Sequence, residues 1–262
     1  VHSSLPPSSS DRWIHCPPSA QICAKAQDKG SSYAREGTDA HSLCEYLLKK
    51  ALGYKVRDPT EDLDYYDQEM QDCAEGYRDF VMEQIAEAKE HSPDVEVKVE
   101  QRLDFSRWVV GGFGTGDAVI VSEGHAHIID FKYGVGVLVP AAGSEGTGNS
   151  QLKCYALGVI DAYDFLYDIK EVKLSIYQPR REHIDTFTMT KDELIEWADN
   201  VLAPAARLAA KGEGEFHAGD HCIFCAARGN CRERTRYNLE LAKYDFAEPA
   251  TLNNEEIAEI LQ

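Results

Sequence analysis

The sequence lacks the features that place a protein in a membrane or along a nucleic acid. Its 262 residues contain no run of about 18 apolar residues, and residues 1–13 lack the apolar core of a signal peptide. We therefore expect no membrane span and a cytoplasmic location. Excess positive charge is also missing. The formal net charge of −18 argues against non-specific wrapping of nucleic acid by a basic surface.

Internal repeats are absent too, and the composition is ordinary, with 43% hydrophobic and 27% charged residues, which is typical of a globular protein with a sizeable core. An extended segment is expected at 1–15, followed by helices at 31–53 (beginning near Gly37) and at 64–91. The middle of the chain predicts a strand at 95–100, a hairpin at 114–132, a helix from Asn149, and strands at 172–178 and 183–189. Three helices are expected after these strands: one from a Thr190 capping box to about Ala210, one ending at about Lys243, and one from Thr251. This order predicts an α/β fold with a mixed central sheet and flanking helices.

The segment that carries most of the chemistry spans residues 114–132, with the sequence GTGDAVIVSEGHAHIIDFK. Apolar runs on both sides of Gly124 predict a β-hairpin, and alternation along the second strand places Asp130 and Lys132 on one face. Two carboxylates, Asp117 and Asp130, beside one ammonium are costly unless they have a task. We expect them to hold a divalent metal ion beside a phosphate, with Lys132 near the attacking water. The alternative is a hairpin whose charges face solvent.

Helices and loops near this hairpin supply further candidates. His41 lies one turn before Glu45 on its helix, and Gln151 and Tyr155 share a helix face. Each has an ordinary alternative: a buried helix histidine and two helix-surface residues. Glu100 is interpreted as an exposed strand residue, with a further metal ligand as the alternative. The candidate DNA contacts are basic or aromatic: Arg35, Tyr133, Lys153, Arg180 and Arg181.

Eight cysteines in a cytosolic chain suggest metal or cluster ligation rather than disulfides. Cys222, Cys225 and Cys231 form a tight group. Zinc would accept His217 or His221 as the fourth ligand, whereas an iron–sulfur cluster would require a fourth cysteine, for which Cys16 before Pro17 is the best candidate. The alternative is three reduced thiols. The other cysteines are assigned to the core (Cys44 and Cys154) or to structural or free thiols (Cys23 and Cys73).

The ordered set His41, Asp117, Asp130-x-Lys132 and Gln151-x3-Tyr155 resembles the PD-(D/E)XK nuclease superfamily, in its RecB-like branch. The phrases Glu36-Gly37-Thr38-x2-His41 and Ser8-x-Ser10-x5-Cys16-Pro17, together with the closing cysteines, are similar to its iron–sulfur members, such as AddB-type nuclease domains and CRISPR spacer-acquisition exonucleases. Over about 8–245, the chain more closely resembles an uncharacterised phage and prophage family of this type, often found among replication and recombination genes.

This resemblance implies one nuclease domain over 1–262, with a restriction-endonuclease-like core at about 31–210, a cluster region from 16–30 and 211–245, and a tail at 246–262. It implies four metal ligands, which are His41, Asp117, Asp130 and the carbonyl of Phe131. Lys132 would be the catalytic lysine, and Gln151 and Tyr155 the pair that supports the site and the DNA backbone. A 4Fe–4S cluster would be held by Cys16, Cys222, Cys225 and Cys231. Asp130 departs from the many relatives that have Glu there.

The implied activity is that of a Mg²⁺- or Mn²⁺-dependent deoxyribonuclease, expected to be an exonuclease acting on single-stranded DNA or on duplex ends in phage replication or recombination. The resemblance also implies a bacterial host cytoplasm, with a phage single-strand-binding or recombination protein as a candidate partner. Two alternatives stay open: a catalytically silent DNA-binding or partner-docking module with a structural metal cluster, and a zinc-bound structural protein.

Overall fold

The computed structural model describes residues 3–26, 31–245, 254 and 257. The chain forms two compact units, one comprising Val1–Ser10 and Gln27–Ala203, the other Asp11–Ala26 and Pro204–Gln262. We describe each unit by itself. In the described ranges no helix is long and apolar enough to cross a membrane. The helix predicted from Thr251 and the tail at 246–262 fall outside the described residues, apart from the two isolated positions.

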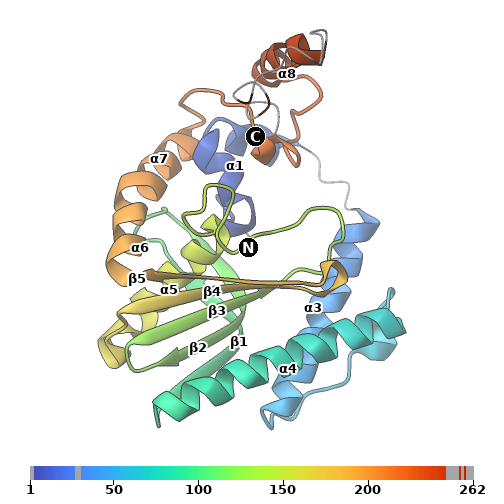
Figure 1. The fold of residues 1–262 in the computed structure, drawn as a ribbon, viewed down its shortest axis with the longest axis vertical. Coiled ribbons are helices and arrows are strands. Elements are labelled where there is room, and N and C mark those ends of the chain that lie inside the picture. The colour runs from blue at the N-terminus through green and yellow to red at the C-terminus, as the bar shows by residue number, and fades with distance from the viewer. Residues whose placement is uncertain (1–2, 27–30, 246–253, 255–256, 258–262) are drawn as a thin grey trace. The chain divides into compact units, whose positions relative to one another are not determined.

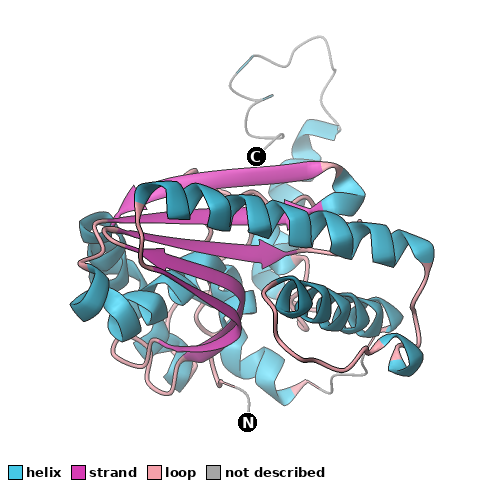
Figure 2. Ribbon diagram, turned by 90° about the horizontal axis from the view of Figure 1, so that it is seen from below, coloured by secondary structure: helices cyan, strands magenta, loops and turns pink. Residues whose placement is uncertain are grey.

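The first unit is built on one mixed sheet of five strands (Figures 1 and 2). The strands are β1 (Val95–Asp104), β2 (Phe113–Ser122), β3 (His125–Phe131), β4 (Glu171–Gln178) and β5 (His183–Thr190). Their order in the sheet follows the chain, and all neighbours are antiparallel except β3 and β4. A parallel pair needs a long crossover, which α5 (Ser150–Tyr167) provides.

Helices cover both faces of this sheet. Two long helices, α3 (Ser32–Ala51) and α4 (Gln68–His91), bury their apolar stripes against strand residues that include Ile120 and Phe131. The crossover helix α5 packs on β1, β2 and β3. Short 3-10 turns at Pro7–Ser9, Thr60–Asp62 and Pro179–Arg181 join these elements. The predicted α/β class with a mixed sheet is confirmed.

Capping side chains explain where the helices begin. Ser31 accepts a hydrogen bond from the amide of Ala34, so α3 starts five residues before the predicted Gly37. Asp67 caps α4 in the same way, which places its start at Gln68 rather than at 64. Asn149 caps α5, and the predicted Thr190 capping box is present in α6 (Lys191–Trp197).

The predicted hairpin is also confirmed, with Gly124 at the turn in a left-handed conformation (φ 75°) that favours glycine. The predicted helix from the Thr190 capping box to about Ala210 is present as a continuous helical segment that contains a π-helical turn at Ala198–Leu202 before α7 (Ala203–Lys211). Pro204 has no amide hydrogen to donate to the preceding turn, which accounts for a wider turn at this place.

The second unit has little regular structure around its cysteines. It contains α1 (Ser10–His15, its first residue belonging to the first unit), α2 (Ser19–Lys25), α7 apart from Ala203, a 3-10 turn at Asp220–Cys222 and α8 (Arg232–Asp245). The expectation of an extended segment at 1–15 is wrong, because the 3-10 turn at Pro7–Ser9 and α1 occupy part of it. Among the described residues of 212–245, Cys222 alone is buried.

Candidate functional site

The site in the first unit lies where the ladder between β2 and β3 ends. The last paired residues are Ala118 and Ile129. Beyond this pair the backbone ladder stops, and the amide of Phe131 donates instead to the side chain of Asp117, at 2.7 Å from its Oδ2. The Lys132 amide donates to the carbonyl of Tyr177 on β4 at 2.9 Å. The backbone that carries both acids and the lysine is therefore fixed by hydrogen bonds on each side.

A hydrogen-bonded chain joins β3 to α5. Lys132 Nζ lies 2.9 Å from Asp130 Oδ2 and donates to Gln151 Oε1, also at 2.9 Å. Gln151 Nε2 lies within donating distance of Asp130 Oδ1 (3.1 Å) and of the Tyr155 hydroxyl (3.0 Å). The side chains of Asp130, Lys132, Gln151 and Tyr155 thus hold one another in a single arrangement.

His41 reaches the same acids from α3. Its Nδ1 lies 3.2 Å from Asp117 Oδ1. Desolvation lowers the pKa of His41, but the charge and hydrogen bond of Asp117 outweigh it and raise the pKa to about 9. Without a metal ion, a protonated imidazole therefore supplies the positive charge beside Asp117 at neutral pH.

Glu100 on β1 joins this group, although the sequence pattern favours an exposed strand residue. Single ligand atoms of His41, Glu100 and Asp117 all lie within 4.8 Å of one another. Burial, reinforced by the charge of Asp117, raises the pKa of Glu100 to about 7. The alternating strand pattern at 95–100 did not predict this role for Glu100, because it contains no sign that the backbone changes conformation at that residue.

These residues fit a divalent cation. Asp130 is 3% exposed, and burial raises the pKa of its carboxyl group against the opposing effect of Lys132. Its Oδ2 accepts no hydrogen bond within the described chain, although the Lys132 ammonium is near. Oxygen atoms of Glu100 and Asp117 with a nitrogen of His41 form a mixed donor set that Mg²⁺ or Mn²⁺ accepts, whereas the Asp130 carboxylate lies outside that group of three, beside Lys132. Whether the Phe131 carbonyl is a ligand stays a prediction.

Some of the predicted DNA contacts are buried or engaged by other side chains of the protein. Lys153 is only 2% exposed, donates to the carbonyl of Thr147 and lies over the Trp197 ring, so its assignment as a DNA contact is wrong. Arg180 is engaged by Glu36 and Glu69. It also lies over the ring of Tyr133, itself 4% exposed. Arg35, which reaches the hydroxyl of Tyr65, and the exposed Arg181 remain candidates.

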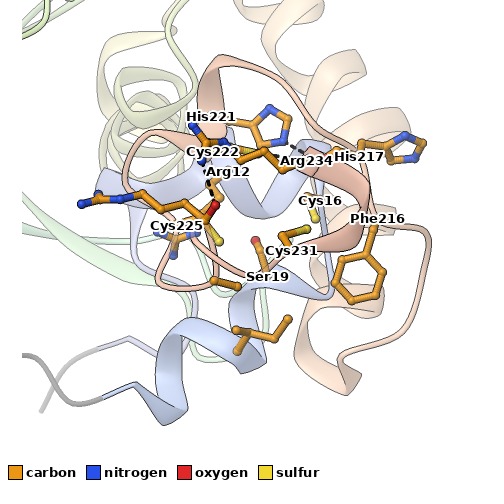
Figure 3. Close-up of a pocket in the computed structure, with 13 residues that line it drawn as sticks. Arg12, Cys16, Ser19, Phe216, His217, His221, Cys222, Cys225, Cys231 and Arg234 are labelled. Atoms are coloured by element: carbon orange, nitrogen blue, oxygen red, sulfur yellow. Dashed lines mark hydrogen bonds between the residues drawn. The ribbon is translucent and has the colours of Figure 1, made fainter. Parts of the chain in front are cut away.

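The second unit gathers the four predicted cysteines around one pocket (Figure 3). Cys16 follows α1, Cys222 ends a 3-10 turn, Cys225 lies in the next turn, and Cys231 precedes α8. Figure 3 shows the sulfur atoms of Cys16, Cys225 and Cys231 turned toward the middle of the pocket. Within the chain that the structure describes, all eight cysteines are free thiols.

The spacing of these thiols can be compared with that of a zinc site. Zinc–thiolate bonds of about 2.3 Å place tetrahedral ligands about 3.8 Å apart. In the described chain, no three of the cysteines and histidines here come within 4.8 Å of one another. Whether these thiols hold zinc or an iron–sulfur cluster stays a prediction.

Two other side chains in the pocket wall carry polar atoms without a hydrogen-bond partner among the described residues. Ser19 is 2% exposed, and its Oγ has no hydrogen-bond partner among the described residues; the same holds for Arg12 Nε. Both line the pocket as potential donors to sulfur. A fifth thiol, Cys23 on α2, lies 4.0 Å from Cys225 Sγ, a proximity that the sequence did not reveal. His221 is engaged by the His217 carbonyl and the His15 ring.

Comparisons with known proteins give a family and two distant structural likenesses. A family model described as "Protein of unknown function (DUF2800)" matches residues 2–262. A solved structure described as SSO0001 is 13% identical with a TM-score of 0.27, over 74% of this chain and 96% of that chain. A phage-related exonuclease from Haemophilus somnus 129PT is 12% identical with a TM-score of 0.30, over 80% and 95%. At these TM-scores neither likeness carries an argument.

Proposed function

The chain belongs to the DUF2800 family of proteins of unknown function, and we propose that it is a metal-dependent DNA nuclease of the PD-(D/E)XK type that acts on DNA ends. One observation carries the proposal: Asp117, Asp130 and Lys132 converge at the open end of one hairpin, with His41 and Gln151 in contact with them. Phosphodiester hydrolysis needs an oriented water and positive charge beside the phosphate, and this cluster is built to provide both.

When bound, a Mg²⁺ or Mn²⁺ ion supplies charge neutralisation at the phosphate and lowers the pKa of a water molecule. Asp117, Asp130 and His41 would hold the ion. Lys132 has a fixed position between Asp130 and Gln151, which leaves part of its ammonium to orient the attacking water or a phosphate oxygen. In the overall reaction, a water oxygen bonds to phosphorus, one bridging P–O bond breaks, and the leaving oxygen takes a proton.

Gln151 would act through Lys132 rather than on the phosphate alone. Its amide accepts from Lys132 and faces Asp130 and Tyr155, so it fixes the direction of the ammonium. Tyr155 is buried, which raises the pKa of its hydroxyl and keeps it neutral. The hydroxyl can therefore hold the Gln151 side chain without adding charge. These two residues would thus position the lysine and the DNA backbone beside it.

We assign the four pocket cysteines, Cys16, Cys222, Cys225 and Cys231, to a 4Fe–4S cluster. Because Cys222 is the one buried residue in the described part of 212–245, this segment cannot be stabilised by an apolar core of its own. A cluster that cross-links it to the residues after α1 would contribute folding free energy instead. Its assigned role is structural. Zinc is the alternative, and iron and zinc analysis of the purified protein separates the two.

The proposed activity is tested by digestion of end-labelled single-stranded and double-stranded DNA with Mg²⁺ or Mn²⁺. We expect wild type to shorten the DNA from its ends and Asp117→Ala to leave it intact. Asp161→Ala, an exposed carboxylate on α5, is the matched control and should cleave like wild type. Binding of DNA without cleavage by wild type under every metal condition would refute the nuclease and favour a non-catalytic DNA-binding module.

A further inference from the structure

Glu100 and Asp117 face each other across two antiparallel strands. The β1–β2 register pairs Val99 with Ala118 and Gln101 with Gly116, so residues 100 and 117 are opposite one another, but the ladder is not closed between them. Opposing side chains in an antiparallel pair lie about 5 Å apart at their Cβ atoms, and like charges there are destabilising. The strands therefore bring two carboxylates together at a place where the sheet is locally open.

The backbone at Glu100 is unusual as well. Its φ of 52° lies in the left-handed region, in the middle of a strand, and the residue is not glycine or asparagine. Such a conformation is energetically unfavourable for a residue other than glycine and persists where the surrounding structure holds it. By itself this strain indicates no ligand. It shows that the direction of the Glu100 side chain is set by the surrounding tertiary structure rather than by regular strand geometry.

His41 is the nearest charged partner of the Glu100 carboxylate among the described residues, and no ion pair joins the two side chains. Within the described chain this carboxylate accepts no hydrogen bond and forms no ion pair, and the nearby Lys49 ammonium is taken by Glu45. His41 on α3 approaches from the third side, with its ligand atom within 4.8 Å of those of both acids. Three ligand atoms from three different elements thus surround one small space.

We propose that Glu100 is a direct ligand of the divalent cation, completing a His41–Glu100–Asp117 position beside the Asp130–Lys132 pair. This inference deepens the proposed nuclease centre and depends on that proposal for its biochemical meaning. Two carboxylates and an imidazole form a mixed oxygen and nitrogen set, for which Mn²⁺ has a higher affinity than Mg²⁺ or Ca²⁺. We therefore expect this position to bind Mn²⁺ more tightly than Mg²⁺ or Ca²⁺. A bound cation would also remove the repulsion between the carboxylates of Glu100 and Asp117.

The experiment is titration of the metal-free protein with Mn²⁺, followed by the loss of the free-ion electron paramagnetic resonance signal. Glu100→Gln keeps the shape of the side chain and removes its charge. We expect its Kd for Mn²⁺ to rise about tenfold or more. Glu96→Gln on the same strand, where Glu96 pairs with Lys98, is the matched control and should bind like wild type. Equal Kd values for the two variants would overturn the assignment.

Thermal melting gives a second readout that a purely structural glutamate would not produce. If Glu100 is there to bind a cation, Glu100→Gln removes a repulsion, so the metal-free variant melts higher than wild type and gains less from added Mn²⁺. A lower metal-free melting temperature with an unchanged Mn²⁺ gain would refute the proposal. Glu100→Asn, which tolerates the left-handed backbone, repeats the test should the glutamine variant misfold.

The two proposals fail in different ways. Wild type that cleaves DNA and binds Mn²⁺, with Glu100→Gln binding equally well, removes Glu100 from the ligand set and leaves the nuclease intact. Wild type that binds Mn²⁺ through Glu100 and cleaves no DNA removes the nuclease and leaves a cation site. Wild type that binds no Mn²⁺ removes both.

Discussion

The two candidate centres of this protein are built in opposite ways. The acid centre lies on regular elements: α3, β1, β2, β3 and α5 each contribute a side chain, and the sheet beneath them packs against buried helices. Three of the four pocket cysteines lie on turns within 212–245, where Cys222 alone is buried among the described residues. The packed fold therefore fixes the geometry of the acid centre, whereas we expect the cysteine centre to need its bound inorganic group to fix the conformation of the segment around it.

Hydrogen bonding shows the same difference. At the acid centre, Asp130, Lys132, Gln151 and Tyr155 bond to one another through their side chains. At the cysteine centre the hydrogen bonds are mostly those of backbone turns, and two pocket donors lack a partner among the described residues. Removing metal from the acid centre should therefore leave its geometry in place, while removing the inorganic group from the cysteine centre should not.

The largest expected effect is on activity. Lys132→Ala should lower the cleavage rate by about 10³-fold, because it removes the charge that orients the water or phosphate. Because the two centres are expected to be independent, the iron content and melting temperature of Lys132→Ala should stay close to those of wild type. Lys170→Ala, an exposed lysine on the loop before β4, is the control. Loss of iron in Lys132→Ala would show that the two centres are not independent.

A large structural effect is expected from the cysteines. Cys222→Ser should lose its iron, and amide hydrogen exchange should become fast throughout 212–245, since no apolar core remains to protect that segment. Exchange in β2, β3 and α5 should be unchanged. Cys73→Ser on α4 is the matched control and should keep its iron. Normal protection of 212–245 in an iron-free Cys222→Ser protein would contradict the structural role.

A smaller effect is expected from Gln151. Gln151→Ala should lower kcat by roughly 10- to 100-fold with little change in KM, because it frees Lys132 from its fixed position. Tyr155→Phe should cost less, since it removes one contact to Gln151. A KM effect with unchanged kcat would assign Gln151 to DNA binding instead.

The smallest effect is on the stability of the metal-free protein with pH. The pKa of His41 is raised from 6.5 to about 9, so its stabilisation is complete below 6.5 and is lost as the pH rises to 9. The pKa of Glu100 is raised from 4.5 to about 7, so its ionisation adds a penalty that is complete above 7. With EDTA present, the melting temperature should fall between pH 6.5 and 9, and less so in His41→Asn. Parallel curves for the two proteins would contradict this.

Much of the fold could be predicted because local rules and the final structure agree. The Gly124 turn, the Asn149 and Thr190 caps and the alternation in β2 and β3 depend on neighbouring residues alone. The convergence of Asp117, Asp130 and Lys132 followed from the hairpin, since pairing brings the ends of two adjacent strands together.

The rest depends on long-range geometry that no local pattern contains. The role of Glu100 could not be read from an alternating strand, because its left-handed backbone is held by the surrounding fold. Cys23 is close to Cys225 only because two segments about 200 residues apart in sequence fold into one unit. Lys153 looked like a surface cation, but α5 turns it inward, onto Trp197 and the carbonyl of Thr147.

The central claim is that the acids at the open end of the hairpin hold a cation. The most direct measurement is the anomalous scattering of Mn²⁺ in crystals of the protein soaked with that ion. We predict a peak within bonding distance of Asp117, with His41 or Asp130 as a second ligand. Peaks confined to surface carboxylates elsewhere, with none beside Asp117, would contradict the account.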